Sequence, residues 1–355
     1  MTVSLLIGDA LDHLRQMASD SIDCCVTSPP YWGLRDYGVD GQLGLEPTLA
    51  EHIEVMVAVF MEVRRVLTPS GTCWVNYGDC YATKPNGRSA ADTKAAGNDD
   101  RTFRDKPFST VQGSLKPKDL CMVPNRLAIA LQDAGWWVRS EIIWGKPNPM
   151  PDSSGRYRPS TAHEKLFLLT KSAKSYYDSE AVRMPAAESS IARWNQDVDK
   201  QLGSDRANAG GKTNGNLKAV GGPRPDKQRG HAGFNDRWDG MTKAEQQENG
   251  RLLRNYESDL SAIIPVEVWS IATAAFSEAH FATFPPALVA PCIMAGCPIG
   301  GTVLDPFFGA GTTGLVADRL KRNCLGIELN PDYAALAEAR IDRDRGGLLK
   351  AMEAA

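Results

Sequence analysis

Residues 302–314 read Thr-Val-Leu-Asp-Pro-Phe-Phe-Gly-Ala-Gly-Thr-Thr-Gly, and they carry the strongest fold signal in the chain. Its first residues have the composition of a buried strand, its three glycines form a G-x-G-x-x-G turn, and a helical pattern follows. A second strand-like run, 323–327, ends at Glu328, 23 positions after Asp305, where an acidic residue can bind a ribose. Because a strand, a glycine turn and a helix together cradle a nucleotide, the stretch predicts an adenosine-binding α/β domain.

Strand-like and helix-like runs alternate over the rest of the chain. Near the N-terminus, a strand, a carboxylate at its tip (Asp9), a helix and a second strand follow one another. Because this alternation is typical of α/β proteins, it predicts a mostly parallel sheet with helices on both faces. A turn at 68–71 is expected to separate one helix from the next strand. The expected strands include 22–26, 72–76, 136–144 and 164–170, and the expected helices include 52–67 and 124–134.

The composition excludes several classes of protein. With 355 residues, 42% of them hydrophobic, the chain can bury a substantial core, and a net charge of −3 rules out a uniformly basic nucleic-acid coat. No apolar run approaches the roughly 20 residues of a membrane span, and Asp9 and Asp12 come too early for a signal peptide. The eight cysteines show no zinc-ligand spacing, so we expect no metal and no disulfides, with Cys24 and Cys25 buried. We expect a cytoplasmic protein without membrane contact.

Two polar segments interrupt the alternation and carry an excess of positive charge. Residues 81–118 contain eight Lys or Arg and four Asp, and residues 201–254 contain ten Lys or Arg, six Asp or Glu, and the aromatic residues Phe234 and Trp238. Both segments are too long to be simple connections, so each is either a solvated loop or a functional insertion. In a chain that is acidic overall, such local charge favours a localised polyanion-binding site.

The identity of the adenosine cofactor depends on the residues that flank the glycine turn. The turn by itself would equally suit a nicotinamide dinucleotide, as in an NAD(P)-dependent oxidoreductase. An acidic residue at the strand tip, Asp305, would repel a pyrophosphate but would attract the ammonium group of a methionine moiety. This charge favours S-adenosylmethionine.

A second motif follows the strand predicted at 22–26. The run Thr27-Ser28-Pro29-Pro30-Tyr31-Trp32 is a rigid turn, and together with residues 305–313 it resembles the two signature motifs of DNA amino-methyltransferases, which methylate adenine N6 or cytosine N4. In the β group of that family the catalytic motif precedes the cofactor motif, and the target-recognition region lies between them. This sequence has the same order of motifs. The resemblance implies a permuted Rossmann-like fold. It divides the chain into a catalytic half at 1–174 with the insertion 81–118, a target-recognition region at 175–260, and a cofactor-binding half at 261–355.

The resemblance also implies roles for individual residues in binding S-adenosylmethionine. Glu328 would bind the ribose hydroxyls, and Asp9 would bind the adenine amino group. The segment 280–285 resembles the one that enters the cofactor pocket, with Phe284 as the expected contact. The methionine end would be lined by Asp305, Phe307, Gly309, Gly311, Thr312 and Thr313.

The chemistry of amino methylation explains why a rigid turn is needed. An exocyclic amino nitrogen is a poor nucleophile because its lone pair is delocalised into the ring, so catalysis depends on positioning. Ser28 Oγ and the Pro29 carbonyl can accept the two amino hydrogens, and Pro30 helps to hold that carbonyl rigidly. Tyr31 would stack on a base flipped out of the DNA duplex.

Other classes of protein account for less of the sequence. An NAD(P)-dependent oxidoreductase leaves the Ser-Pro-Pro-Tyr turn without a role, and a DNA-binding module would not need both motifs. Protein glutamine methylation usually uses Asn where this chain has Ser28. Cytosine C5 methylation needs a Cys nucleophile, but Pro291-Cys292 lies in an apolar, helical-looking stretch. His163 and His280 are expected to be structural or to contact substrate. The choice between adenine and cytosine, the recognition sequence and any paired nuclease stay open, and a homodimer is a candidate assembly.

Overall fold

The computed structural model describes residues 1–34, 36–84, 108–149, 157–185, 262–263, 266–273 and 284–353. The interior of the insertion 81–118, the basic segment 201–254 with Phe234 and Trp238, and the segment 280–283 lie outside the described residues. The chain divides into two compact units, one made of 1–182 and 266–355 and the other of 183–265. The boundaries expected at 174 and 260 stay predictions.

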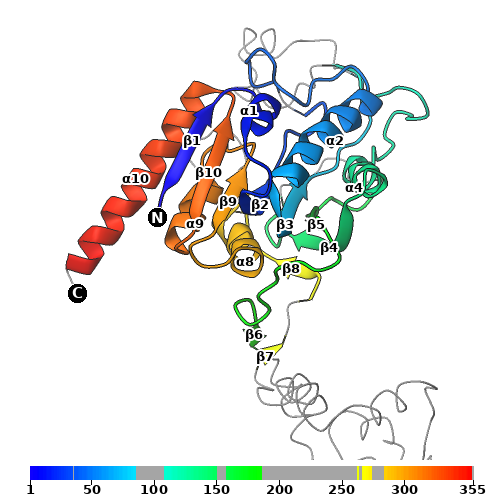
Figure 1. The fold of residues 1–355 in the computed structure, drawn as a ribbon. Helices are drawn as coiled ribbons and strands as arrows, with labels where there is room; N and C mark the ends of the chain where they lie inside the picture. Colours follow the sequence, from blue (N-terminus) through cyan, green and yellow to red (C-terminus); the bar gives the residue numbers. More distant parts are fainter. Residues whose placement is uncertain are drawn as a thin grey trace, which may run out of the picture. The chain divides into compact units, whose positions relative to one another are not determined.

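The first unit is built on an eight-stranded sheet with the strand order β1-β10-β9-β2-β3-β5-β4-β8 (Figure 1). Neighbouring strands are parallel except where β5 pairs antiparallel with both β3 and β4. The predicted mostly parallel sheet is therefore confirmed. The strands are β1 (Val3–Ile7), β2 (Ile22–Thr27), β3 (Leu67–Tyr77), β4 (Trp137–Gly145), β5 (His163–Thr170), β8 (Val268–Ser270), β9 (Thr302–Asp305) and β10 (Asn323–Glu328).

Helices cover both faces of the sheet, as expected. They are α1 (Ala10–Gln16), α2 (Leu49–Val66), α4 (Val123–Asp133), α8 (Pro286–Gly296), α9 (Thr312–Arg319) and α10 (Pro331–Glu353). One core contains α1, α2 and α4, and the other contains α8, α9 and α10. Alternate residues of each strand enter opposite cores, because side chains of a strand point to opposite faces. Cys25 and Leu304 join the first core, whereas Cys24 and Val303 join the second.

The first strand–helix–strand step does not place its strands side by side. The C-terminal strands β9 and β10 lie between β1 and β2. The next step is local, because β2 and β3 are parallel neighbours joined through α2. The N-terminal strand therefore completes the part of the sheet that the C-terminal glycine motif builds.

Helix α2 begins three residues before the sequence pattern indicated. Thr48 and Glu51 form a reciprocal capping box, in which each side chain accepts a hydrogen bond from the backbone N–H of the other. The turn predicted at 68–71 is wrong, because β3 already begins at Leu67. Ile22 pairs with Leu67 and Cys24 pairs with Thr72. Residues 68–71 therefore outnumber the one residue opposite them in β2 and form an irregularity in β3.

The second unit contributes one described feature, a short pairing of β6 (Met184–Pro185) with β7 (Ala262–Ile263). The strands are antiparallel, with Met184 opposite Ile263. The two ends of the intervening segment therefore lie at neighbouring strand positions. Within the residues that the structure describes, no helix has the length and apolar character needed to cross a membrane.

Candidate active site

A cavity of about 310 Å³ opens at the carboxyl ends of the central strands. From the adjacent strands β9 and β2 the chain continues in opposite directions, to β10 on one side and to β3 on the other. In doubly wound sheets, this reversal creates the crevice in which ligands bind. The cavity brings together ten of the residues expected from the sequence: Asp9, Ser28, Pro29, Pro30, Tyr31, Phe284, Phe307, Gly309, Thr312 and Glu328.

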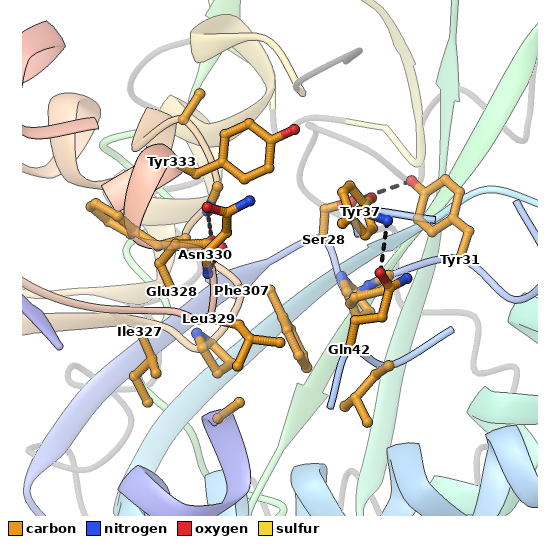
Figure 2. Close-up of a pocket in the computed structure, with 18 of the residues that line it drawn as sticks. Ser28, Tyr31, Tyr37, Gln42, Phe307, Ile327, Glu328, Leu329, Asn330 and Tyr333 are labelled. Carbon is orange, nitrogen blue, oxygen red and sulfur yellow. Dashed lines mark hydrogen bonds between the residues drawn. The ribbon is translucent and has the colours of Figure 1, made fainter. Parts of the chain in front are cut away.

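The two sequence motifs form opposite walls of this cavity. Figure 2 shows Ser28 and Tyr31 on one side, Glu328 and Asn330 on the other, and Phe307 between them. The first pair belongs to the turn after β2, and the second to the end of β10 and the start of α10. Motifs almost 280 residues apart in the chain thus face one space.

Asp305 does not line the cavity but joins its two walls from behind. Its carboxylate is completely buried. It accepts hydrogen bonds from Thr27 Oγ1 at 2.7 Å, Thr313 Oγ1 at 2.6 Å and the backbone N–H of Phe307 at 3.1 Å. The strand before the Ser-Pro-Pro-Tyr turn is therefore tied directly to the glycine loop. A direct contact between Asp305 and the methionine ammonium stays a prediction.

Asp305 should make the stability of the protein depend on pH. Burial raises the pKa of its carboxyl from 3.8 to about 6, although hydrogen bonds from Thr313 and Thr27 act in the opposite direction. Because the folded state binds this proton more tightly than the unfolded state, the contribution is greatest below about pH 4 and is lost as the pH rises through about 6. We expect the unfolding free energy of the wild type, measured relative to Asp305→Asn, to fall by up to about 3 kcal/mol over that range. Urea denaturation of both proteins at several pH values measures the difference, and a flat difference would contradict it.

Two glycines of the loop are required by close packing. Gly311 has a φ of 73°, and a Cβ there would lie 2.8 Å from the Cβ of Ala337 in α10. A Cβ on Gly314 would lie 2.5 Å from the ring of Phe308. Gly311 and Thr313 therefore support the loop from outside the cavity, whereas Gly309 lines it.

Glu328 is held at the cavity wall by backbone donors. Its Oε2 accepts from the N–H of Gly309 at 2.7 Å, and its Oε1 accepts from the N–H of Asn330 at 2.8 Å. Burial raises the pKa of this carboxyl, although the backbone hydrogen bonds act against that effect. The contact with Gly309 fixes the acid expected to bind ribose against the glycine turn.

The Ser-Pro-Pro-Tyr turn is connected to β3 and β5 through the hydroxyl of Tyr31. This hydroxyl lies 2.9 Å from Glu164 Oε2, 3.3 Å from Asn76 Oδ1 and 3.3 Å from Ser28 Oγ. Glu164 also forms an ion pair with Lys146 at the end of β4. Burial, followed by the charge of Glu164, raises the pKa of Tyr31 well above its usual value, so the hydroxyl stays protonated.

Part of the cavity wall consists of residues that were not predicted from the sequence. Lys146 and Glu164 lie near the ends of β4 and β5 and meet only because these strands pair, so no local pattern indicates them. Asn330 and Tyr333 follow Glu328 at the start of α10, and a helix start beside a predicted ribose-binding acid could have indicated them. Tyr37, from the loop after the Ser-Pro-Pro-Tyr turn, meets Tyr333 edge to face with ring centroids 6.5 Å apart.

The cysteine and histidine considered as alternatives do not line the cavity. Cys292 is buried within α8, as expected, and its thiol donates to the Leu288 carbonyl at 3.2 Å. Burial raises the pKa of this thiol, which suppresses the nucleophilic thiolate. His163 is exposed at the start of β5, and His280 lies outside the described residues.

These features define a class of protein. The sheet is doubly wound, and the cavity lies where the order of the strands reverses. A glycine turn forms one wall of the cavity and a Pro-Pro turn forms the other. This combination is that of a Rossmann-like methyltransferase. The cavity also fits S-adenosylmethionine chemically: Asp9 and Glu328 offer carboxylates to its amine and hydroxyl donors, and Ile327 and Leu329 offer apolar surface to a purine ring.

Comparisons with known proteins agree with this class. The model of the DNA methylase family, named for N6 and N4 methylation, matches residues 22–339. Type II methyltransferase M.XycI from Xanthomonas campestris pv. cyanopsidis is 40% identical over 98% of this chain and 90% of its own length. M.Cfr9I from Citrobacter freundii is 39% identical over the same shares, and M.SmaI from Serratia marcescens is 40% identical over 96% of this chain and 91% of its own.

The chain therefore belongs to the N6 and N4 DNA methylase family. It is an S-adenosylmethionine-dependent methyltransferase that acts on an exocyclic amino group of DNA. The comparisons give no support to an NAD(P)-dependent oxidoreductase. Among solved structures, the PvuII DNA methyltransferase (cytosine-N4-specific) aligns with a TM-score of 0.56 at 17% identity, covering 99% of this chain and 93% of that one, and thus shares the fold.

Proposed function

We propose that this enzyme methylates a base turned out of duplex DNA, and that the two walls of the cavity divide the reaction between them. The observation that carries the proposal is the hydrogen bond from Thr27 to the buried Asp305, because it ties the catalytic turn to the cofactor loop. The product is N6-methyladenine or N4-methylcytosine. When bound, S-adenosylmethionine supplies the electrophilic methyl group.

The wall formed by β9, β10 and α1 binds the cofactor. Phe307, Gly309 and Thr312 surround the methionine end, with Gly311 and Thr313 supporting them and Asp305 contributing negative charge from behind. The remaining contacts are those expected from the family motifs: Glu328 with the ribose, Asp9 with the adenine amino group, and Phe284 with the pocket entrance.

The opposite wall orients the target amino group. Ser28 Oγ and the Pro29 carbonyl accept its two hydrogens as the nitrogen becomes tetrahedral, which directs the lone pair toward the methyl group. Pro30 stiffens the turn, and Tyr31 contacts the face of the base.

The assembly in which the enzyme works is also a proposal. The similar proteins are named Type II methyltransferases, which supports a role in restriction–modification. The sequence supports four further parts of this proposal. The substrate is duplex DNA, and residues 175–260 are the target-recognition region. The enzyme is a homodimer, and it is located in the cytoplasm. Light scattering with and without a DNA duplex tests the dimer.

The decisive experiment is incubation of the protein with unmethylated duplex DNA and isotopically labelled S-adenosylmethionine, followed by nucleoside mass spectrometry. We expect label in N6-methyladenine or N4-methylcytosine. Label in 5-methylcytosine, or transfer to protein and not to DNA, would contradict the proposal. Single-stranded DNA of the same sequence serves as the comparison for the duplex requirement.

A further inference from the structure

A buried chain of polar side chains lies directly behind the catalytic turn. Its members are Glu46 in the loop before α2, His52 in the first turns of α2, and Tyr77 at the end of β3. The side chains of His52 and Tyr77 are almost completely buried, and that of Glu46 is 11% exposed. None of the three lines the cavity, so they do not touch the substrate or the cofactor from their present positions.

The contacts in this chain are short and continuous. Glu46 Oε2 lies 2.7 Å from His52 Nδ1, and His52 Nε2 lies 2.6 Å from the Tyr77 hydroxyl. Burial raises the pKa of Glu46, but hydrogen bonds from His52 and the N–H of Gly44 outweigh it and lower the pKa overall. Glu46 is therefore an ionised acceptor fixed from both sides.

Tyr77 holds the backbone of the catalytic turn on both sides of Tyr31. Its hydroxyl donates to the Pro30 carbonyl at 3.1 Å and accepts from the N–H of Trp32 at 3.1 Å. Its ring also stacks on the ring of Tyr31, with centroids 4.7 Å apart and planes inclined by 26°. One side chain thus restrains the two peptide groups that flank Tyr31 and the aromatic ring between them.

The contacts of Tyr77 explain why the chain extends to His52 and Glu46. The Tyr77 hydroxyl has one proton, which it directs to the Pro30 carbonyl. The His52 ring lies between Tyr77 and Glu46, with Nε2 directed to the hydroxyl and Nδ1 to the carboxylate. Glu46 thereby fixes the orientation of the ring that holds Tyr77 in place.

We infer that Glu46, His52 and Tyr77 are positioning residues that set the rate of methyl transfer by fixing the Ser28–Tyr31 turn. This inference rests on the proposed function of that turn. Amino methylation depends on placing a weak nucleophile in line with the methyl group, and a displacement of about 1 Å can lower a rate about 100-fold. Loss of this network should therefore lower the rate of methyl transfer and not the affinity for either ligand.

Tyr77→Phe tests the inference because it removes the hydroxyl and keeps the ring that stacks on Tyr31. We expect its single-turnover methylation rate to fall about 10- to 100-fold, with dissociation constants for S-adenosylmethionine and DNA changed by less than about threefold. His52→Leu should reproduce the loss, whereas His52→Gln, whose amide can still donate to Tyr77, should recover most of the rate. Phe60→Leu, at a buried position of the same helix as His52, is the control for a purely structural effect.

Hydrogen exchange measured by mass spectrometry gives a readout that does not need activity. Without the Tyr77 hydroxyl, the N–H of Trp32 loses its acceptor, so peptides covering residues 28–33 should exchange at least about 10-fold faster in Tyr77→Phe and not in Phe60→Leu. Unchanged exchange and unchanged rate in Tyr77→Phe, or an equal loss in Phe60→Leu at equal melting temperature, would overturn the inference. If the wild type failed to methylate DNA, the proposed function would fail, while the exchange experiment would still decide whether the network restrains the turn.

Discussion

Removal of residues 206–251, with a short Gly/Ser bridge in their place, is expected to weaken binding to the recognised DNA site at least about 10³-fold, to the level of non-specific binding. The segment lies outside the described residues, but its sequence belongs to the basic region with interleaved aromatics that phosphate and base contacts require. Cofactor binding should be nearly unchanged, because both cofactor motifs lie in the other compact unit. Fluorescence anisotropy with a specific duplex and calorimetry with S-adenosylmethionine measure the two affinities.

The span that contains this segment begins and ends at paired strands. Met184 of β6 lies opposite Ile263 of β7, and paired strands lie roughly 5 Å apart. A shorter connection between β6 and β7 can therefore close without separating these two strands. A variant in which residues 206–251 are scrambled keeps the charge and composition, so it should keep non-specific binding and lose preference for the site. Methylation at the same sites by the deletion variant would show instead that the segment is a spacer.

Ser28→Ala is expected to lower the single-turnover methylation rate about 10²- to 10³-fold, equivalent to about 2 to 4 kcal/mol, while leaving the affinities for cofactor and DNA largely unchanged. Ser28 lines the cavity, and its hydroxyl is proposed to accept an amino hydrogen only as the nitrogen becomes tetrahedral. An interaction made mainly in the transition state affects the rate constant and not ground-state binding. Rapid-quench kinetics under saturating conditions measure the effect.

The alternative role of Ser28 is to support the turn through its 3.3 Å contact with the Tyr31 hydroxyl. In that case, Ser28→Ala would melt at a lower temperature but would react at the wild-type rate once folded. Ser21→Ala is a matched control, because Ser21 also makes one hydroxyl hydrogen bond, to the Ala18 carbonyl, and lies away from the cavity. A folded Ser28→Ala protein with the rate of the control would remove Ser28 from the mechanism.

Local sequence patterns predicted the elements that carry the site. The glycine turn at 309–314 and the Pro-Pro turn at 29–30 depend on residues adjacent in the chain, because backbone conformation is set by near neighbours. The same is true of helix α2, whose apolar spacing placed it to within three residues at its start. The range 68–71, expected as a turn, lies within β3, where the strand departs from regular pairing with β2 between Leu67 and Thr72.

By itself, the sequence determined the class of fold, the two motifs and ten of the residues that line the cavity. The three-dimensional structure was needed to show that β1 lies beside β10, that β5 runs antiparallel, and that Asp305 is buried behind the cavity wall. It also showed that His52 and Tyr77, 25 positions apart, meet beneath the catalytic turn. The physical reason is that periodicity shows which face of an element is apolar but not which element covers it, since strand order and register depend on contacts between distant parts of the chain.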